Sequence, residues 1–265
     1  MSRALKILAF NFLGVLYSLN IAALTNGLPS EIKEHPWLVK IDTCAGAVIS
    51  SNHILTAAHC VADKTVGLMT LRLNDGHRLP RAKKIHIHPQ YSPWDEVGIK
   101  RHDIAIIETS GEISFNQNVG SISLATFTDA ELNLIDSTYS LTGWGRTEDG
   151  SYPRIPHKIT NLESLPHVNS LFWKEEEHLF YLESDSPKQD FKSTFFTGDY
   201  LAIEVTSKRS ACRGDSGAPI VRTSDSSLAA IVAHGQDDCL NQAAFFATSI
   251  PAHSRWIAHI LESDQ

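Results

Sequence analysis

Three short segments of the chain carry the residue types that chemistry at a hydroxyl group requires. Thr56–Cys60 ends in a histidine and a cysteine, and in His102–Ile107 the carboxylate of Asp103 precedes a strongly apolar run. In Cys212–Pro219, flanking glycines place Ser216 on a tight turn. A serine hydroxyl is a poor nucleophile by itself, and a histidine that accepts its proton activates it. A histidine, a carboxylate and a serine in these segments therefore suggest nucleophilic catalysis.

Each of these residues also has an ordinary structural interpretation when it is taken alone. A lone histidine is usually a satisfied structural residue, and a lone aspartate at the start of a strand is usually a turn residue. However, a buried aspartate costs several kcal/mol unless a partner accepts its charge, so Asp103 implies a partner. It is the combination of His59, Asp103 and Ser216, in that order, that is specific.

The three segments resemble the active-site motifs of the chymotrypsin-like (trypsin-type) serine peptidases. They read TAAHC, HDIAII and CRGDSGAP, in that family's order. Leu24–Gly27 is similar to the family's mature N-terminus, Thr142–Gly145 to its central TGWG segment and Trp256–Ile257 to its C-terminal helix. The resemblance covers nearly all of the chain after residue 23. It implies an all-β fold of two six-stranded antiparallel β-barrels with a C-terminal α-helix.

The resemblance also implies how the chain is divided. We expect a peptidase domain over residues 24–265, with the first barrel in 24–126 and the second barrel and helix in 127–265. His59 and Asp103 then lie on the first barrel and Ser216 on the second, with the active site in the cleft between them. The segment near Trp173–Thr197 is longer than is usual in the family, and we assign it no role.

The roles of the site residues follow from the same resemblance. Ser216 is the expected nucleophile, His59 the general base and Asp103 the residue that orients the histidine. The backbone N–H groups of Gly214 and Ser216 are expected to form the oxyanion hole. In the family a free N-terminal amine pairs with the aspartate before the nucleophile. In this chain those positions are Leu24 and Asp215.

The primary substrate pocket is expected to have a neutral base. The residues that match it are Ser210, Ala211, Ala233, His234, Gly235 and Phe245. A neutral base does not offset the cost of desolvating a substrate Lys or Arg, so we expect a preference for apolar or small side chains. If Phe245 projects inward, the pocket is shallow and small side chains are preferred.

The N-terminus and the cysteines predict export. Residues 1–23 have a positive start, an apolar middle and small residues at the end, which is typical of a secretory signal peptide; a membrane anchor is the alternative. In an oxidising compartment, Cys44, Cys60, Cys212 and Cys239 are expected to form disulfides, in any of three pairings. Our hypothesis is the sequence-local pairing, Cys44–Cys60 and Cys212–Cys239, which would support both catalytic loops.

Away from the motifs, the pattern of short runs between turn signals is also all-β. The strand-like runs are Trp37–Ile41, Ala47–Ile49, Lys84–Ile87, Ile104–Glu108, Tyr139–Thr142, Leu201–Val205, Pro219–Val221 and Leu228–Ala233. Apolar residues at helical spacing after Pro251 predict one C-terminal helix.

Composition excludes several classes of protein. The 265 residues are 42% hydrophobic and 20% charged, which is typical of a folded globular chain, and the net charge of −7 argues against nucleic acid as a partner. We expect a secreted monomer, extracellular or periplasmic, that acts on protein or peptide substrates, with no membrane partner after signal removal. His86 and His88 alternate on a predicted strand, but no third ligand is evident, so neither a metal nor a cofactor is expected. A non-catalytic, protease-like binding protein is the alternative function.

Overall fold

The computed structural model describes residues 24–93, 100–126, 137–164, 171–174, 179–182, 200–235, 238–242 and 244–263. The predicted signal peptide and most of the long segment that follows Trp173 lie outside these residues. Within them, no helix is both long and apolar enough to cross a membrane.

The first of two large antiparallel sheets has six strands, in the order β5-β2-β3-β4-β7-β6. Its strands are β2 (Leu38–Ile41), β3 (Cys44–Ser50), β4 (His53–Thr56), β5 (Leu71–Leu73), β6 (Ala82–Ile87) and β7 (Ala105–Thr109). The second sheet has seven strands, in the order β1-β9-β8-β13-β14-β15-β12. Its strands are β1 (Leu28–Pro29), β8 (Thr138–Gly143), β9 (His157–Glu163), β12 (Tyr200–Glu204), β13 (Pro219–Arg222), β14 (Leu228–His234) and β15 (Ala244–Ser249).

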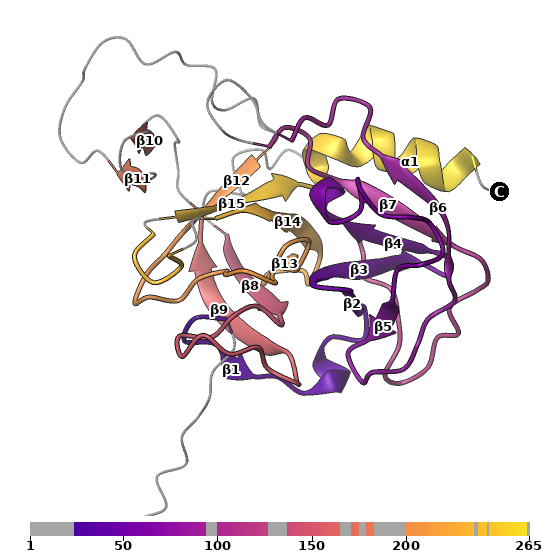
Figure 1. Ribbon diagram of the computed structural model, residues 1–265, viewed down its shortest axis with the longest axis horizontal. Coiled ribbons are helices and arrows are strands. Elements are labelled where there is room, and N and C mark those ends of the chain that lie inside the picture. The colour runs from indigo at the N-terminus through magenta and orange to yellow at the C-terminus, as the bar shows by residue number, and fades with distance from the viewer. Residues whose placement is uncertain are drawn as a thin grey trace, which may run out of the picture.

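Smaller elements complete the fold. A separate hairpin consists of β10 (Leu171–Lys174) and β11 (Leu179–Leu182), and the α-helix α1 spans Ser254–Ser263. Short 3₁₀ helices are η1 (Ile32–Glu34), η2 (Ala58–Cys60) and η5 (Pro251–His253). The two large sheets lie side by side, and α1 runs along one side of the first (Figure 1).

The core follows from strands that are apolar on both faces. Every residue of β4, β7 and β15 is buried, including His53 in β4 and Glu108 in β7, so these strands show no alternation of buried and exposed residues. One apolar cluster lies in each sheet, and a third joins both sheets to α1 through Ile257 and Ile260. The predicted strand-like runs all overlap observed strands, and the predicted C-terminal helix is confirmed.

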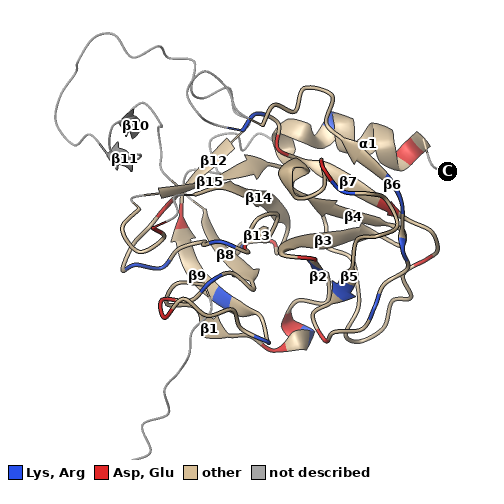
Figure 2. Ribbon diagram, viewed as in Figure 1, with Lys and Arg blue, Asp and Glu red and all other residues tan. Residues whose placement is uncertain are grey.

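The second sheet differs from the expected six strands because the N-terminal segment joins it. Leu28 and Pro29 of β1 pair with Lys158 and His157 of β9, although β1 lies within residues 24–126. The N-terminal segment therefore belongs structurally to the half that carries Ser216. Basic and acidic residues are interspersed along loops and sheet edges in Figure 2, in keeping with the weakly acidic net charge of −7.

Candidate active site

A histidine and an aspartate of the first half form a close pair. Asp103 is fully buried, and its Oδ2 lies 2.6 Å from His59 Nδ1. Its other oxygen, Oδ1, accepts a hydrogen bond from the His59 backbone N–H at 2.8 Å. Both carboxylate oxygens therefore hold one residue, which fixes the ring and directs Nδ1 to the aspartate. The ring's other nitrogen, Nε2, is left for chemistry.

The sheet register brings these two residues together. Thr56, at the end of β4, pairs with Ala105, at the start of β7, so η2 after β4 lies beside the turn before β7. In that turn the Ile104 N–H donates to the His102 carbonyl at 2.7 Å, and His102 has a φ of 45°. Asp103 thus lies two residues before a fully buried strand, β7, and the turn fixes its position.

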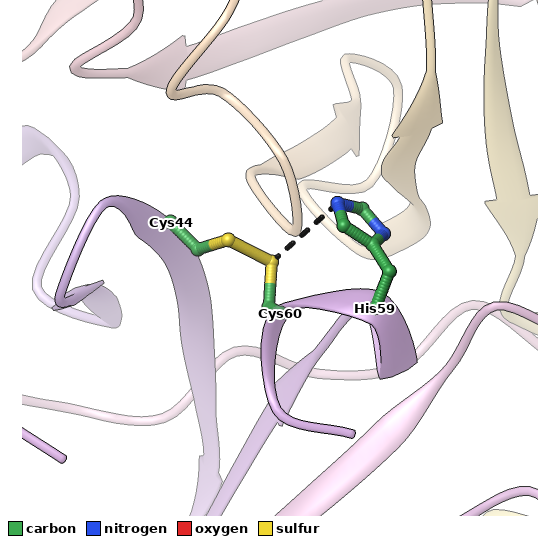
Figure 3. Close-up of side chains that lie close together, drawn as sticks. All are labelled: Cys44, His59 and Cys60. Carbon is green, nitrogen blue, oxygen red and sulfur yellow. Dashed lines mark hydrogen bonds between the residues drawn. A yellow bond between two sulfur atoms is a disulfide. The ribbon is translucent and has the colours of Figure 1, made fainter. Parts of the chain in front are cut away.

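A disulfide anchors η2. The structure contains Cys44–Cys60, which ties η2 to the first residue of β3, and Cys212–Cys239 in the second half; both pairs are the sequence-local ones. Figure 3 shows the His59 ring beside the first disulfide, with Nε2 directed at Cys60 Sγ at 3.8 Å. Because both sulfurs are in a disulfide, the cluster of Cys44, His59 and Cys60 has no thiolate to offer a metal ion.

The serine of the third motif reaches this place from the second half. Ser216 lies before β13, and its backbone carbonyl accepts a hydrogen bond from the Ala45 N–H of β3 at 2.8 Å. Gly217 has a φ of 75°, and a Cβ there would overlap the carbonyl of Ala45 and the hydroxyl of Thr56. Glycine at this position therefore allows the loop to lie directly against the first sheet.

His59 and Ser216 line one cleft, of about 650 Å³, together with Gly214, Trp144 and Tyr152. His59 Nε2 lies 3.8 Å from Cys60 Sγ, which carries no proton in the disulfide, and no hydrogen bond between Nε2 and Ser216 Oγ is found among the described residues. His59 and Asp103 thus form a hydrogen-bonded pair. Ser216 lies in the same cleft as His59, but in the described part of the chain no hydrogen bond joins its side chain to the ring. Hydrogen bonds of this kind are often loose without substrate and tighten when it binds.

The backbone N–H groups of the serine loop differ in whether they have a hydrogen-bond acceptor in the protein. The N–H groups of Asp215 and Gly217 donate to the carbonyls of Cys212 and Val232. For Gly214 and Ser216, no protein acceptor of the N–H group is found in the described part of the chain. These are the two donors that the sequence predicts for an oxyanion hole.

Asp215 is as deeply buried as Asp103 but has different partners. It accepts hydrogen bonds from the backbone N–H groups of Cys212, at 2.9 Å, and Gly145, at 2.7 Å. Burial raises the pKa of its carboxyl to about 7, against the opposing effect of these two donors. A Cβ at Gly145 would overlap the carboxylate, so the TGWG segment can approach it only as glycine. No cation pairs with Asp215 among the described residues.

Leu24, the predicted partner of Asp215, lies in the same half. Its side chain is fully buried in the apolar cluster that includes Trp144, Ala211 and Ala218. Thr25 then bridges to Ser210. Among the described residues, no hydrogen bond or ion pair joins Leu24 to Asp215, and the Leu24 nitrogen is here part of a peptide bond.

The predicted pocket residues form only a small cavity. Its volume is about 100 Å³, and its lining includes Ser216 and four of the six predicted pocket residues: Ala211, Ala233, His234 and Gly235. Phe245 does not line this cavity, because its side chain is fully buried in the core of the second sheet. The condition under which Phe245 would narrow the pocket is therefore not met for this cavity, and Ser210 does not line it either.

A glutamine that the sequence did not single out bonds to Ser210, the predicted base residue, although neither residue is among those that line this cavity. Gln242 is 3% exposed, and its Nε2 donates to Ser210 Oγ and, at 3.0 Å, to the Ala211 carbonyl. Ser210 is fully buried beneath it, and its own hydroxyl donates to the Ala211 carbonyl at 2.9 Å. A Cβ on Gly235 would lie 3.1 Å from Gln242 Oε1. The glutamine side chain therefore connects Ser210 and Ala211 with Gly235.

Lys100 lines the cavity, and the sequence did not single it out. Its Nζ donates to the Ala233 carbonyl at 3.3 Å. Burial lowers the pKa of Lys100, while nearby Asp103 acts in the opposite direction. No local motif marks Lys100 or Gln242, since each acts through a partner distant in sequence.

The chain matches a known protein family over most of its length. The family model described as Trypsin matches residues 24–257, which is most of the sequence. The chain belongs to the trypsin family. Members of this family are serine-type endopeptidases. Insect members are among the curated relatives.

This trypsin-family chain is 29% identical over 228 residues to the CLIP domain-containing serine protease B15 of Anopheles gambiae, covering 74% of the chain and 57% of that relative. It is 26% identical over 212 residues to trypsin alpha of Drosophila melanogaster, covering 75% and 72%. The chain thus spans little more than half the length of the first relative. Among solved structures it resembles neuropsin, a serine protease of mouse brain, with a TM-score of 0.70 and 19% identity, over 89% of this chain and 99% of that one. That likeness supports the fold.

Proposed function

We propose that the protein is a secreted serine endopeptidase that hydrolyses peptide bonds through Ser216, His59 and Asp103 and a covalent acyl-enzyme. The observation that carries the proposal is the placement of His59, already held by Asp103 at 2.6 Å, in one cleft with Ser216. Neither residue of the first half needs to move relative to the other for the chemistry.

The reaction begins when substrate enters the cleft and Ser216 Oγ donates a hydrogen bond to His59 Nε2. Ser216 Oγ attacks the peptide carbonyl, and its proton passes to His59 Nε2. The same proton then goes to the leaving amine, and the acyl group stays on the serine. Water then attacks the acyl carbonyl while its proton passes to His59 Nε2, and His59 returns that proton to Ser216 Oγ as the bond between the serine and the acyl group breaks and the acid leaves. Throughout, Asp103 stabilises the imidazolium that forms and keeps Nδ1 protonated.

The negative oxygen of each tetrahedral intermediate needs hydrogen-bond donors. The N–H groups of Gly214 and Ser216 are suited to this role, because they lack protein acceptors and belong to the loop that carries the nucleophile. Loss of one such donor typically lowers the rate by about 10²–10³-fold.

The same loop depends on Asp215, and we propose that the amine of Leu24 is its missing partner. Cleavage before Leu24 would create a positively charged N-terminal amine in the same half of the fold as Asp215. Asp215 is buried there with no cationic partner among the described residues. Formation of that ion pair compensates the burial of the carboxylate. Because no basic residue lies between Lys6 and Leu24, signal cleavage after Ala23 would free this amine without a trypsin-type activator.

The preferred substrate has a small side chain before the cleaved bond. The cavity has a volume of only about 100 Å³, and the neutral pair of Gln242 and Ser210, next to its lining residues Ala211 and Gly235, supplies no counter-charge. A cation, Lys100, also lines this cavity and repels a substrate Lys or Arg. Alanine, glycine or serine at this substrate position fits these constraints.

Labelling with an organophosphonate serine probe tests the function. We expect the form that begins at Leu24 to be labelled, and Ser216→Ala, prepared with the same N-terminus, to remain unlabelled. Failure of a folded wild-type protein that begins at Leu24 to react would instead support a non-catalytic, protease-like binding protein.

A further inference from the structure

Three histidines from distant parts of the chain meet next to the turn that holds Asp103. His88 follows β6, His102 precedes β7 and His253 ends η5, at the entrance to α1. One ring nitrogen from each lies within 4.8 Å of the others. We propose that these histidines bind a divalent transition-metal ion, for which Zn²⁺ is the fitting class, and that the ion joins the two sheets and α1.

The spacing of the rings matches a shared metal ion. A tetrahedral ion about 2.0–2.1 Å from one nitrogen of each ring sets those nitrogens about 3.3 Å apart and the ring centres about 5 Å apart. His102 Nδ1 and His253 Nε2 are 3.1 Å apart. The ring centroids are 4.7 Å apart for His88 and His102, 5.2 Å for His88 and His253, and 5.3 Å for His102 and His253.

The surroundings favour a ligating form of His253. Its Nδ1 donates to the Ser249 carbonyl at 2.7 Å, so the lone pair is on Nε2, which points at His102. Metal-binding histidines are commonly oriented in this way by a carbonyl on the second nitrogen. His253 is 3% exposed and His88 9%, whereas His102 is only partly buried, so the ion has a solvent side for water as its fourth ligand.

One adjustment is required. The rings of His88 and His102 are stacked, with 17° between their planes, and two parallel rings cannot both direct a lone pair at one ion. His88 must turn about its χ2 bond, a soft torsion, and give up a long 3.3 Å hydrogen bond from the Gln90 N–H to Nδ1. The ion replaces the hydrogen bond between His102 and His253 at nearly the same separation, so the Asp103 turn keeps its position.

His86 provides a matched control. It alternates with His88 around β6, yet its Nε2 lies 3.7 Å from Glu108 Oε2, and it is not part of the histidine cluster. The sequence-based expectation of no metal site rested on His86 and His88 alone, for which no third ligand was evident. The fold supplies the other ligands from residues 14 and 165 positions further along than His88.

Trp256 gives the experiment a reporter, since its ring lies 5.1 Å from that of His88. Untagged protein is titrated with Ni²⁺, which quenches nearby tryptophan fluorescence, and Zn²⁺ is then added as a competitor. We expect one equivalent of Ni²⁺ to quench, Zn²⁺ to reverse the quenching, and Zn²⁺ to raise the unfolding temperature. Trp256→Phe should abolish the optical signal but not the thermal shift.

Variants decide where the ion binds. In His88→Gln and, separately, His253→Gln, we expect the dissociation constant for Zn²⁺, measured by calorimetry, to rise by at least about 100-fold. In His86→Gln and His59→Ala it should be unchanged. Unchanged affinity in folded His88→Gln would overturn the proposal, and so would loss of binding in His59→Ala, which would place the ion in the catalytic cleft.

Discussion

The two halves of the molecule each bury an aspartate completely, and they treat it differently. Asp103, in the first half, meets both the ring and the backbone N–H of His59. Asp215, in the second half, meets only the backbone N–H groups of Cys212 and Gly145, and burial raises its pKa to about 7. One carboxylate has its ionisable partner, and the other has none among the described residues.

This difference indicates which half is assembled by folding alone. The first half has a disulfide on η2 and a register that fixes both functional side chains. The second half holds Ser216, the proposed nucleophile, and its loop, but it buries Asp215 without a balancing cation among the described residues. We infer that the first half is complete in the precursor, whereas the second half is completed by the amine of Leu24.

The largest expected effect comes from breaking the pair of the first half. Asp103→Asn keeps the shape but not the charge, so it should stabilise the wrong tautomer of His59 and lower kcat by about 10⁴-fold. Kinetics on the form that begins at Leu24 measure this. Asp75→Asn, in a surface turn, is the control and should leave kcat as it is. Equal losses in the two variants would contradict the role of Asp103.

The second prediction concerns the pH dependence of stability in a precursor whose Leu24 nitrogen is blocked by a preceding residue. Since the folded pKa of Asp215 is raised from 3.8 to about 7, the folded state binds the proton more tightly than the unfolded one. The stability that the protonated Asp215 carboxyl contributes to the folded precursor is therefore complete below about pH 4. It is lost as the pH rises to about 7, which lowers the free energy of unfolding by roughly 4 kcal/mol.

Comparison with Asp215→Asn isolates this effect. His35 acts in the opposite direction, because burial lowers its pKa to about 4, and it is present in both proteins. Denaturant unfolding between pH 4 and pH 7 should show the wild-type precursor losing stability relative to the variant. A constant difference would mean that Asp215 is already compensated.

A smaller effect is expected at the pocket of the second half. Gln242→Ala removes the side chain that spans from Ser210 to Gly235, so the cavity should admit a longer substrate side chain. We expect kcat/KM for a leucine peptide to rise by about 10–100-fold relative to the matched alanine peptide. Asn241→Ala is a matched control, since Asn241 is exposed and bonds only to Asp238. The pocket assignment would fail if the ratio were the same in both variants.

The sequence predicted what its local patterns encode. The apolar runs before and after the motifs predicted β7, β14 and α1, and the motif order predicted that His59 and Asp103 would meet. Both disulfides have the expected pairing. In each case a strong local signal, such as an apolar run, a glycine turn or a cysteine, marks the residue.

The features that the sequence did not predict depend on pairs of distant residues with no local signal. Gln242 bonds to Ser210 across 32 residues, and His102 bonds to His253 across 151. A single glutamine or histidine belongs to no sequence pattern from which its distant partner could be predicted. The pairing of β1 with the second sheet was missed for the same reason, because a two-residue strand carries no pattern.

N-terminal sequencing of the secreted protein, combined with its rate of phosphonate labelling, tests most directly whether the second half is completed by Leu24. The account predicts that protein secreted without any added protease begins at Leu24 and is labelled at Ser216, and that one extra residue before Leu24 suppresses the labelling. A secreted form that begins upstream of Leu24 and is labelled at the full rate would contradict it.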